Sequence, residues 1–299
     1  MATPALAFDR DVQKTFSVTP GGELSVETNG GSIQVTTTTQ SNVIVTAHEH
    51  FRANSESEAE EIANKDLELK IGQNGNDVSV YAKCHNSNGS LWNLFSHSNV
   101  WIDISVAVPE EYRAKLKTSG GGIRVDKLGG DLYANTSGGP IEMGHVTGTI
   151  QATTSGGGVH LAEGDRDAKL STSGGPIEVG ESRGKLDLDT SGGGIHVKAA
   201  MGAVHGETSG GGIEVNFVAA LTADSSLETS GGGIRVKLPK DKGAHIDAST
   251  SGGDVELVDL EATIESGKLN SGSLKAKLGP GGPTLRLRTS GGGIRISAE

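Results

Sequence analysis

One hexapeptide constrains this chain more than any other feature, Thr-Ser-Gly-Gly-Gly-Ile, which stands at residues 118–123 and again at 289–294. Its threonine returns every 18 residues from Thr118 to Thr208, and the spacing then widens to 21. A degraded copy at residues 270–274 precedes the last one. A motif that returns at a short fixed period is typical of one structural unit stacked on copies of itself. The chain is therefore expected to form a solenoid.

The residues on both sides of each glycine run alternate between apolar and polar. Leu132 and Ala134 precede one run, and Ile195 and Val197 follow another. Period-2 alternation predicts strands with one buried face. Each unit then reads as strand, glycine corner, strand and turn. We predict an all-β fold, a single-stranded β-solenoid with roughly ten coils of 18–21 residues and one short helix near the N-terminus.

The first glycine of each run is expected to form the corner of a coil. A sharp repeated corner needs a positive φ or a close approach of adjacent chains, and glycine permits both. Threonines stacked at the inner edge are expected to pass hydroxyl hydrogen bonds along the stack. The corner glycines are Gly120, Gly138, Gly156, Gly174, Gly192, Gly210, Gly231, Gly252 and Gly291.

The N-terminal region, residues 1–112, is expected to hold a first coil, the helix and a cap, continuous with regular repeats over 113–299. Thr28 to Val35 is an imperfect first copy of the repeat. Asn54 or Ser55 can cap a helix that runs to about Ala63, with acidic residues near its N-terminus. Strands are expected at 67–71, 78–80 and 100–108. The polar loop between them, with Trp92 and Phe95, is expected to plug the end of the stack.

The outward position within Gly-Ile-x-Val alternates in charge along the repeats. Neighbouring coils of a β-solenoid lie about 4.8 Å apart, so each charge is expected to lie between two of opposite sign. Such pairs contribute roughly 0.2–1 kcal/mol each and disfavour a register slip by one coil. We predict a structural charge ladder of Arg124, Glu142, His160, Glu178, His196, Glu214, Arg235 and Glu256, followed by Lys275 and Arg295.

The overall charge excludes some functions. The net charge of −11 argues against a nucleic-acid partner, which requires a basic face.

The chain is glycine-rich, with 46 glycines, and only 3% aromatic, which predicts a thin aliphatic core. Cys84 is the only cysteine, so no intramolecular disulfide can form. No apolar run is long enough for a transmembrane segment. Residues 1–7 lack the regions of a signal peptide, so we expect any secretion signal to be absent from this chain.

Two groups of residues that contain histidines are candidates for metal sites. His160, Glu178 and His196 offer good zinc ligands, but two coil spacings would separate the histidines by about 9.6 Å, too far to share an ion. His48, His50, Cys84 and His85 match no strong zinc spacing. We expect the first group to form salt bridges and the second to be scattered surface residues, and we expect no bound metal or other cofactor.

Asp187, Asp189, His205 and Glu207 form the one candidate for catalysis. The alternation places them outward on adjacent coils, where paired carboxylates could serve glycoside hydrolysis or bind calcium. A solvated acidic face is the commoner meaning of such a pattern. The glycine runs neither precede a helix nor end in Gly-Lys-Ser/Thr, so they are not phosphate loops. We identify no catalytic residues.

The Thr-Ser-Gly-Gly-Gly-Ile-x-Val units, the opening copy at 28–35 and the lead-in at 106–109 resemble the bacterial putative-adhesin families of unknown function. Those families are envelope proteins, related to the head-GIN autotransporter-adhesin domain. The resemblance covers nearly the whole chain and implies a right-handed β-helix. It implies an extracytoplasmic protein, in the periplasm or at the cell surface.

We therefore expect a non-enzymatic surface protein that binds or displays, as an adhesin or scaffold. Its partner would be a cell-surface polysaccharide or a protein. The alternative is a polysaccharide lyase or hydrolase that uses the acidic outer face. The last coil is expected to leave an open edge, where Arg286, Arg288 and Arg295 would oppose edge-to-edge pairing, or which would serve self-association.

Overall fold

The structure is a computed structural model that describes residues 6–85 and 100–299. It divides into two compact units, one up to Gly139 and one from Pro140 to Glu299. The expected boundary after residue 112 falls inside the first unit, in the turn that precedes β8. The expected plug with Trp92 and Phe95 lies outside the described residues.

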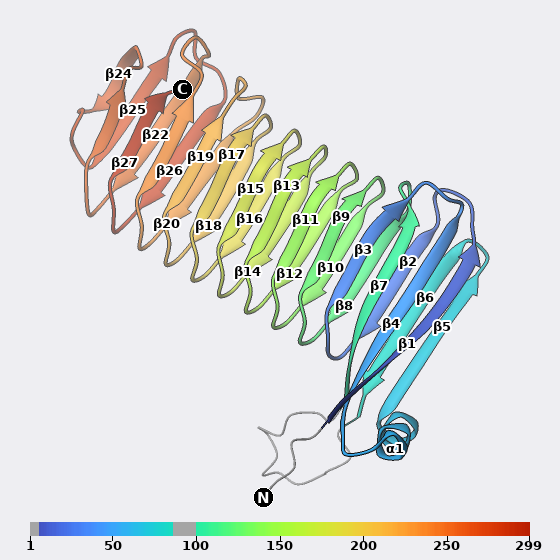
Figure 1. The fold of residues 1–299 in the computed structure, drawn as a ribbon. Helices are drawn as coiled ribbons and strands as arrows, with labels where there is room; N and C mark the ends of the chain where they lie inside the picture. Colours follow the sequence, from blue (N-terminus) through green and yellow to red (C-terminus); the bar gives the residue numbers. More distant parts are fainter. Residues whose placement is uncertain (1–5, 86–99) are drawn as a thin grey trace, which may run out of the picture. The chain divides into compact units, whose positions relative to one another are not determined.

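The first unit contains two sheets and one helix (Figure 1). One sheet has the strand order β1-β4-β7-β3-β9, and the other has the order β10-β8-β2-β6-β5. The elements are β1 (Leu6–Ser17), β2 (Glu23–Thr28), β3 (Ile33–Thr38), β4 (Asn42–Ala53), α1 (Glu56–Asp66), β5 (Leu67–Asn74), β6 (Asp77–Cys84), β7 (Val100–Pro109), β8 (Arg113–Thr118), β9 (Ile123–Leu128) and β10 (Leu132–Thr136).

The imperfect repeat at residues 28–35 forms a coil as predicted. β2 pairs in parallel with β8, and β3 pairs in parallel with β9, so the strands on both sides of this corner join the stack. The segment from β4 to β7 is an insertion between β3 and β8. In one sheet it adds the antiparallel pair of β4 with β7, and β1 pairs with β4 at the edge of that sheet. In the other sheet it adds the β5–β6 hairpin at the edge.

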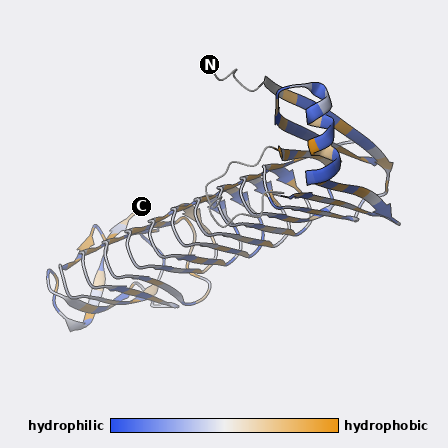
Figure 2. Cartoon of the chain, turned by 90° about the horizontal axis from the view of Figure 1, so that it is seen from below, coloured by the Kyte–Doolittle hydropathy of each residue, from blue (hydrophilic) through white to orange (hydrophobic). Residues whose placement is uncertain are grey.

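Helix α1 begins and ends close to its predicted limits. Ser55 is the N-cap, and its hydroxyl accepts a hydrogen bond from the Glu58 amide at 3.2 Å. The helix is largely hydrophilic (Figure 2), and its two buried residues, Ala59 and Ala63, pack against Phe51 and Val100. Its small apolar face is what attaches it to β4 and β7.

From β11 to β21 the second unit consists of regular coils, each with one strand in each of two sheets (Figure 1). Sheet A has the order β11-β13-β15-β17-β19-β21-β27-β23, and sheet B has the order β24-β25-β22-β26-β20-β18-β16-β14-β12. The strands are β11 (Ile141–Val146), β12 (Ile150–Thr154), β13 (Val159–Gly164), β14 (Ala168–Thr172), β15 (Ile177–Ser182), β16 (Leu186–Thr190), β17 (Ile195–Ala200), β18 (Val204–Thr208), β19 (Ile213–Phe217), β20 (Ser225–Thr229), β21 (Ile234–Leu238), β22 (Ala244–Thr250), β23 (Val255–Val258), β24 (Ala262–Gly267), β25 (Ser273–Leu278), β26 (Thr284–Thr289) and β27 (Ile294–Ala298).

The core of these coils is the inward half of each strand. β14 is buried at Ala168, Leu170 and Thr172, and its alternate residues point outward. Stacked strands of parallel sheets bring the same position of each coil together, as Leu170 opposite Leu188. The alternation read from the sequence therefore predicts the buried face correctly, and the core is aliphatic, as expected.

The buried threonines bond to glycine carbonyls rather than to each other. The Thr190 hydroxyl donates to the carbonyl of Gly175 in the preceding coil at 2.9 Å, and the Thr208 hydroxyl donates to that of Gly193 at 2.7 Å. The expected hydroxyl chain along the stack is thus replaced by a link between each strand and the corner before it.

The C-terminal coils do not stack in sequence order. After β21 the chain forms β22 to β25 and then returns, so that β27 lies between β21 and β23 and β26 lies between β20 and β22. The prediction of an open edge at the last coil is therefore wrong. The edge strands of this end are β23 and the exposed β24.

The arginines of the last coil consequently have another role from the one expected. Arg288 forms an ion pair with Asp247 at 2.9 Å and donates to its backbone carbonyl. Arg295 pairs with Glu256 at 3.2 Å. These side chains bind the inserted strands to their neighbours in the interior of each sheet.

Candidate functional site

The outward column of sheet A follows the predicted charge order from Glu142 to Arg235. Each residue lies directly opposite the next: Glu142, His160, Glu178, His196, Glu214 and Arg235. His160 Nδ1 lies 3.5 Å from a Glu178 carboxylate oxygen, and His196 Nδ1 lies 3.6 Å from one of Glu214. Arg124 occupies the same position in the first unit, on β9 opposite Gln34.

The predicted order of this column is wrong after Arg235. Glu256 is not its neighbour, because β27 inserts Arg295 between them. Lys275 is not in the column, since it lies on β25 in sheet B, opposite Asp247. Two arginines, Arg235 and Arg295, therefore lie directly opposite each other, where the alternation of sign predicted opposite charges.

Close approach explains most of the corner glycines, although not Gly120, where the nearest atom to a Cβ would lie 3.8 Å away. None of the nine has a positive φ. A Cβ on Gly192 would lie 2.9 Å from the Gly174 carbonyl oxygen, and one on the next residue, Gly193, would lie 2.1 Å from that of Gly175. The second glycine of the corner is thus more restricted than the first, which the sequence did not distinguish.

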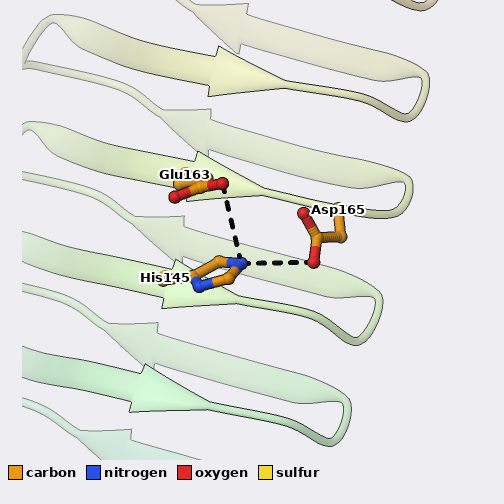
Figure 3. A group of neighbouring side chains, drawn as sticks. All are labelled: His145, Glu163 and Asp165. Atoms are coloured by element: carbon orange, nitrogen blue, oxygen red, sulfur yellow. Dashed lines mark hydrogen bonds and ion pairs between the residues drawn. The ribbon is translucent and has the colours of Figure 1, made fainter.

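A cluster that the sequence analysis missed lies three residues further along the strands of sheet A, at the ends of β11 and β13 and in the turn after β13 (Figure 3). His145 Nε2 lies 3.2 Å from the Asp165 carboxylate and 3.9 Å from that of Glu163. One ligand atom from each lies within 4.8 Å of the others, an arrangement that could hold a metal ion. The signal was present in the sequence, because His145, Glu163 and Glu181 follow each other at the 18-residue period.

Arg183 already neutralises these carboxylates. Its guanidinium bonds to Glu163 at 2.8 Å, to Glu181 at 2.8 Å and to Asp165. The hydrogen bond from His145 and then that from Arg183 hold the pKa of Asp165 below its ordinary value. The carboxylates raise the pKa of Arg183 in turn. A cation that displaced Arg183 would leave the guanidinium unpaired, so the cluster is best interpreted as a salt-bridge network that links coils.

The acidic patch proposed for catalysis is brought together. Asp187 lies opposite His205, and Asp189 lies opposite Glu207. All four residues line one open depression of about 420 Å³ on the outward face of sheet B. Glu207 is in turn opposite Glu228, so three carboxylates stack on adjacent coils without an intervening cation.

The N-terminal histidines and Cys84 are not brought together. His48 pairs with Asp11 and His50 with Asp9, each at 2.8 Å, on the outward face of β4. His50 also stacks on Trp101, with ring centroids 5.1 Å apart. Cys84 ends β6 in the other sheet and contacts the cluster under α1, where burial raises the pKa of its thiol to about 11. Among the described residues these four form no potential metal-binding group.

Taken together, these features define a class of protein: an all-β, solenoid-like repeat protein whose outward faces bear columns of charged side chains. No helix of the described residues has the length and apolarity needed to cross a membrane. The Toastrack DUF4097 family model matches residues 22–297, and the chain belongs to this family.

Several solved structures are similar to this chain over almost its whole length. A protein from Parabacteroides merdae, described as a putative adhesin, has 11% identity and a TM-score of 0.44, with 97% of this chain and 96% of that chain covered. A lipid-binding protein, also described as putative, from Parabacteroides distasonis has 14% identity and a TM-score of 0.44, with 96% of each chain covered.

A third protein, from Bacteroides fragilis and again described as a putative adhesin, has 14% identity and a TM-score of 0.41, with 97% of each chain covered. At these TM-scores the similarities add no argument about function to the family assignment. A search among curated proteins found none that matches.

Proposed function

We propose that this protein is a non-enzymatic β-solenoid of the bacterial envelope that binds or displays, as an adhesin or scaffold. The observation that carries the proposal is the shortness of the turns beside the outward faces. In the second unit, three-residue turns such as Asp165–Asp167 and Arg183–Lys185 connect the strands of successive coils. Such turns build no walls around a substrate, whereas rows of side chains at strand spacing suit an extended partner.

The partner on this proposal is a cell-surface polysaccharide or a protein, met in the periplasm or at the cell surface. The location follows from the resemblance of the repeat to envelope families, including the head-GIN autotransporter-adhesin domain. The same resemblance leads us to propose right-handed coils, about ten in number.

A carbohydrate-active enzyme is the second candidate, and a specific observation favours it. Asp187, Asp189, His205 and Glu207 line one depression large enough for a sugar unit. Against it stands the environment of the carboxylates. They lie on an open face, whereas active sites are pockets that enclose most of the substrate.

One experiment separates these functions. The purified protein would be incubated with a panel of bacterial and plant polysaccharides, with retention and the release of reducing or unsaturated ends recorded together. Retention without products supports the binding function. Products that Asp189→Asn abolishes, and that Glu178→Gln on the opposite sheet does not, would establish the enzyme and overturn the proposal. Neither retention nor products would leave a scaffold or a protein partner.

A further inference from the structure

A cavity of about 270 Å³ opens on the outward face of sheet A, where β27 is inserted beside β21. Four strands line it, each with two outward residues in alternate positions. They contribute Lys198 from β17, Arg235 and Lys237 from β21, and Arg295 from β27. All four cationic side chains are exposed.

The cavity is strongly basic, although the chain has a net charge of −11. Glu214 is the only carboxylate that lines it, and it lies 3.6 Å from His196 Nδ1 on one side and opposite Arg235 on the other. Arg295 has a partner at one side, Glu256. The charged groups of Lys198, Arg235 and Lys237 form no hydrogen bond or ion pair with any residue in the described part of the chain.

The strand order creates this concentration of charge. Along the preceding coils of sheet A, each basic or titratable residue alternates with a carboxylate, as His160 with Glu178. The inserted β27 breaks the alternation and sets Arg295 directly opposite Arg235. Like charges on directly opposite residues are destabilising, and an anion that bridges the two guanidinium groups would remove the repulsion.

A bulge at the rim provides a second irregularity in the same place. The register between β17 and β19 shifts between Val197 and Ala200, so Lys198 lies in the bulged segment. Bulges re-aim side chains and are over-represented next to binding and active sites.

We propose that this cavity, lined by Lys198, Arg235, Lys237 and Arg295, is a binding site for a doubly charged tetrahedral oxyanion, a phosphate or sulfate group. Guanidinium groups match the oxygens of such anions in bidentate pairs, and lysines add point charges around them. The volume accommodates the anion with a small organic group such as a sugar or glycerol. The inference does not rest on the proposed envelope function, since the site belongs to the opposite sheet from the acidic depression.

The test is a titration of the full-length protein at low salt with inorganic phosphate, sulfate and acetate, followed by calorimetry and by thermal unfolding. We expect the two dianions to bind and to raise the midpoint of unfolding, and acetate to bind at least tenfold more weakly. Glucose 6-phosphate and glycerol 1-phosphate then distinguish the sources: binding equal to or tighter than that of the free ion assigns the site to a phosphate ester, and weaker binding assigns it to free phosphate.

The variant Arg235→Gln/Lys237→Gln is suited to this test because neither charged group forms an ion pair or hydrogen bond with the described residues. We expect it to fold, to be at least as stable as the wild type without anion, and to bind phosphate at least tenfold more weakly. Lys169→Gln removes a cation from sheet B as the matched control and should leave binding unchanged. The proposal is overturned if the wild type binds neither dianion, if the double variant binds as tightly, or if the control weakens binding equally.

Discussion

Gly193 lies where a side chain has no room, because the carbonyl of Gly175 in the preceding coil occupies the space of its missing Cβ. The nearest atoms, the Gly175 carbonyl and the Pro176 backbone nitrogen, belong to the backbone of a paired stack, so the strain cannot be relieved by turning a side chain. This restriction returns at the second glycine of the neighbouring corners, as at Gly211, where a Cβ would lie 2.3 Å from the Gly193 carbonyl oxygen.

We expect Gly193→Ala to lower the free energy of unfolding by about 1–3 kcal/mol or more, the usual cost of forcing extra volume into a packed site. Gly30→Ala is the matched control, since a Cβ on this corner glycine meets nothing within 4 Å. Urea unfolding followed by circular dichroism would measure both. Equal stabilities of the two variants would contradict the close-approach argument.

Asp165 provides a pH-dependent contribution. Its pKa is lowered in the folded protein, first by the hydrogen bond with His145 and then by that with Arg183. The stabilisation is therefore fully present above the ordinary pKa of an aspartate, and it is lost as the pH falls through the lowered value. Asp165→Asn should reduce stability at pH 7, and the difference from wild type should shrink below roughly pH 4.

Denaturant midpoints at pH 7, 4 and 3 would measure this loss. Asp241→Asn serves as the control, because Asp241 is an exposed turn residue whose carboxylate forms no hydrogen bond or ion pair with the described residues. A cost of Asp165→Asn that stayed constant down to pH 3 would show that the ionised carboxylate is not what stabilises the cluster.

At the scale of the strands, the same charge has opposite consequences on the two sheets. Glu178 of sheet A lies between His160 and His196. Glu207 of sheet B lies between Asp189 and Glu228. Directly opposite pairs interact by roughly 0.2–1 kcal/mol, with a sign set by the charges.

One pair of charge reversals exposes this difference. Glu178→Lys should destabilise the protein by roughly 0.2–1 kcal/mol, and Glu207→Lys should stabilise it by a similar amount. Thermal unfolding at low salt and about pH 5, where imidazole carries a charge, would compare them, and both shifts should diminish in high salt. The ladder interpretation fails if the two reversals shift the midpoint in the same direction.

The strands also show which features of the structure could be predicted from the sequence. Period-2 alternation determines which residues of β14 or β17 are buried, and the 18-residue period determines their register on the next coil, so both were predictable. The alternation is the same whichever strand lies alongside, so it could not reveal that Arg295 lies between Arg235 and Glu256. The cluster of His145 and Arg183 belongs to a second outward column, which contains Glu163 and Glu181 and was not part of the predicted charge ladder.

At the scale of the whole molecule, the order of the strands determines which part of the chain is indispensable. In a solenoid that stacked in sequence order, the last residues would form its end, and their loss would fray one coil. Here the last two strands, β26 and β27, lie in the interior of both sheets of the second unit. The final segment therefore completes the stack from within.

A chain that ends at Pro283 should consequently lose more than its last coil, because β20 and β21 each lose one of their two partner strands, and β22 and β23 lose their attachment to the stack. We expect a lower unfolding midpoint, and rapid proteolysis from residue 200 onward. The control joins Val258 to Thr284 through a short Gly-Ser linker and so deletes the hairpin of β24 and β25, which lies at the edge of sheet B. That deletion removes the buried Leu274 and Leu278 of β25 but leaves β26 and β27 in place, so it should lower the midpoint less than the truncation does. Should the truncation at Pro283 prove the milder of the two, the interior position of β26 and β27 would be wrong.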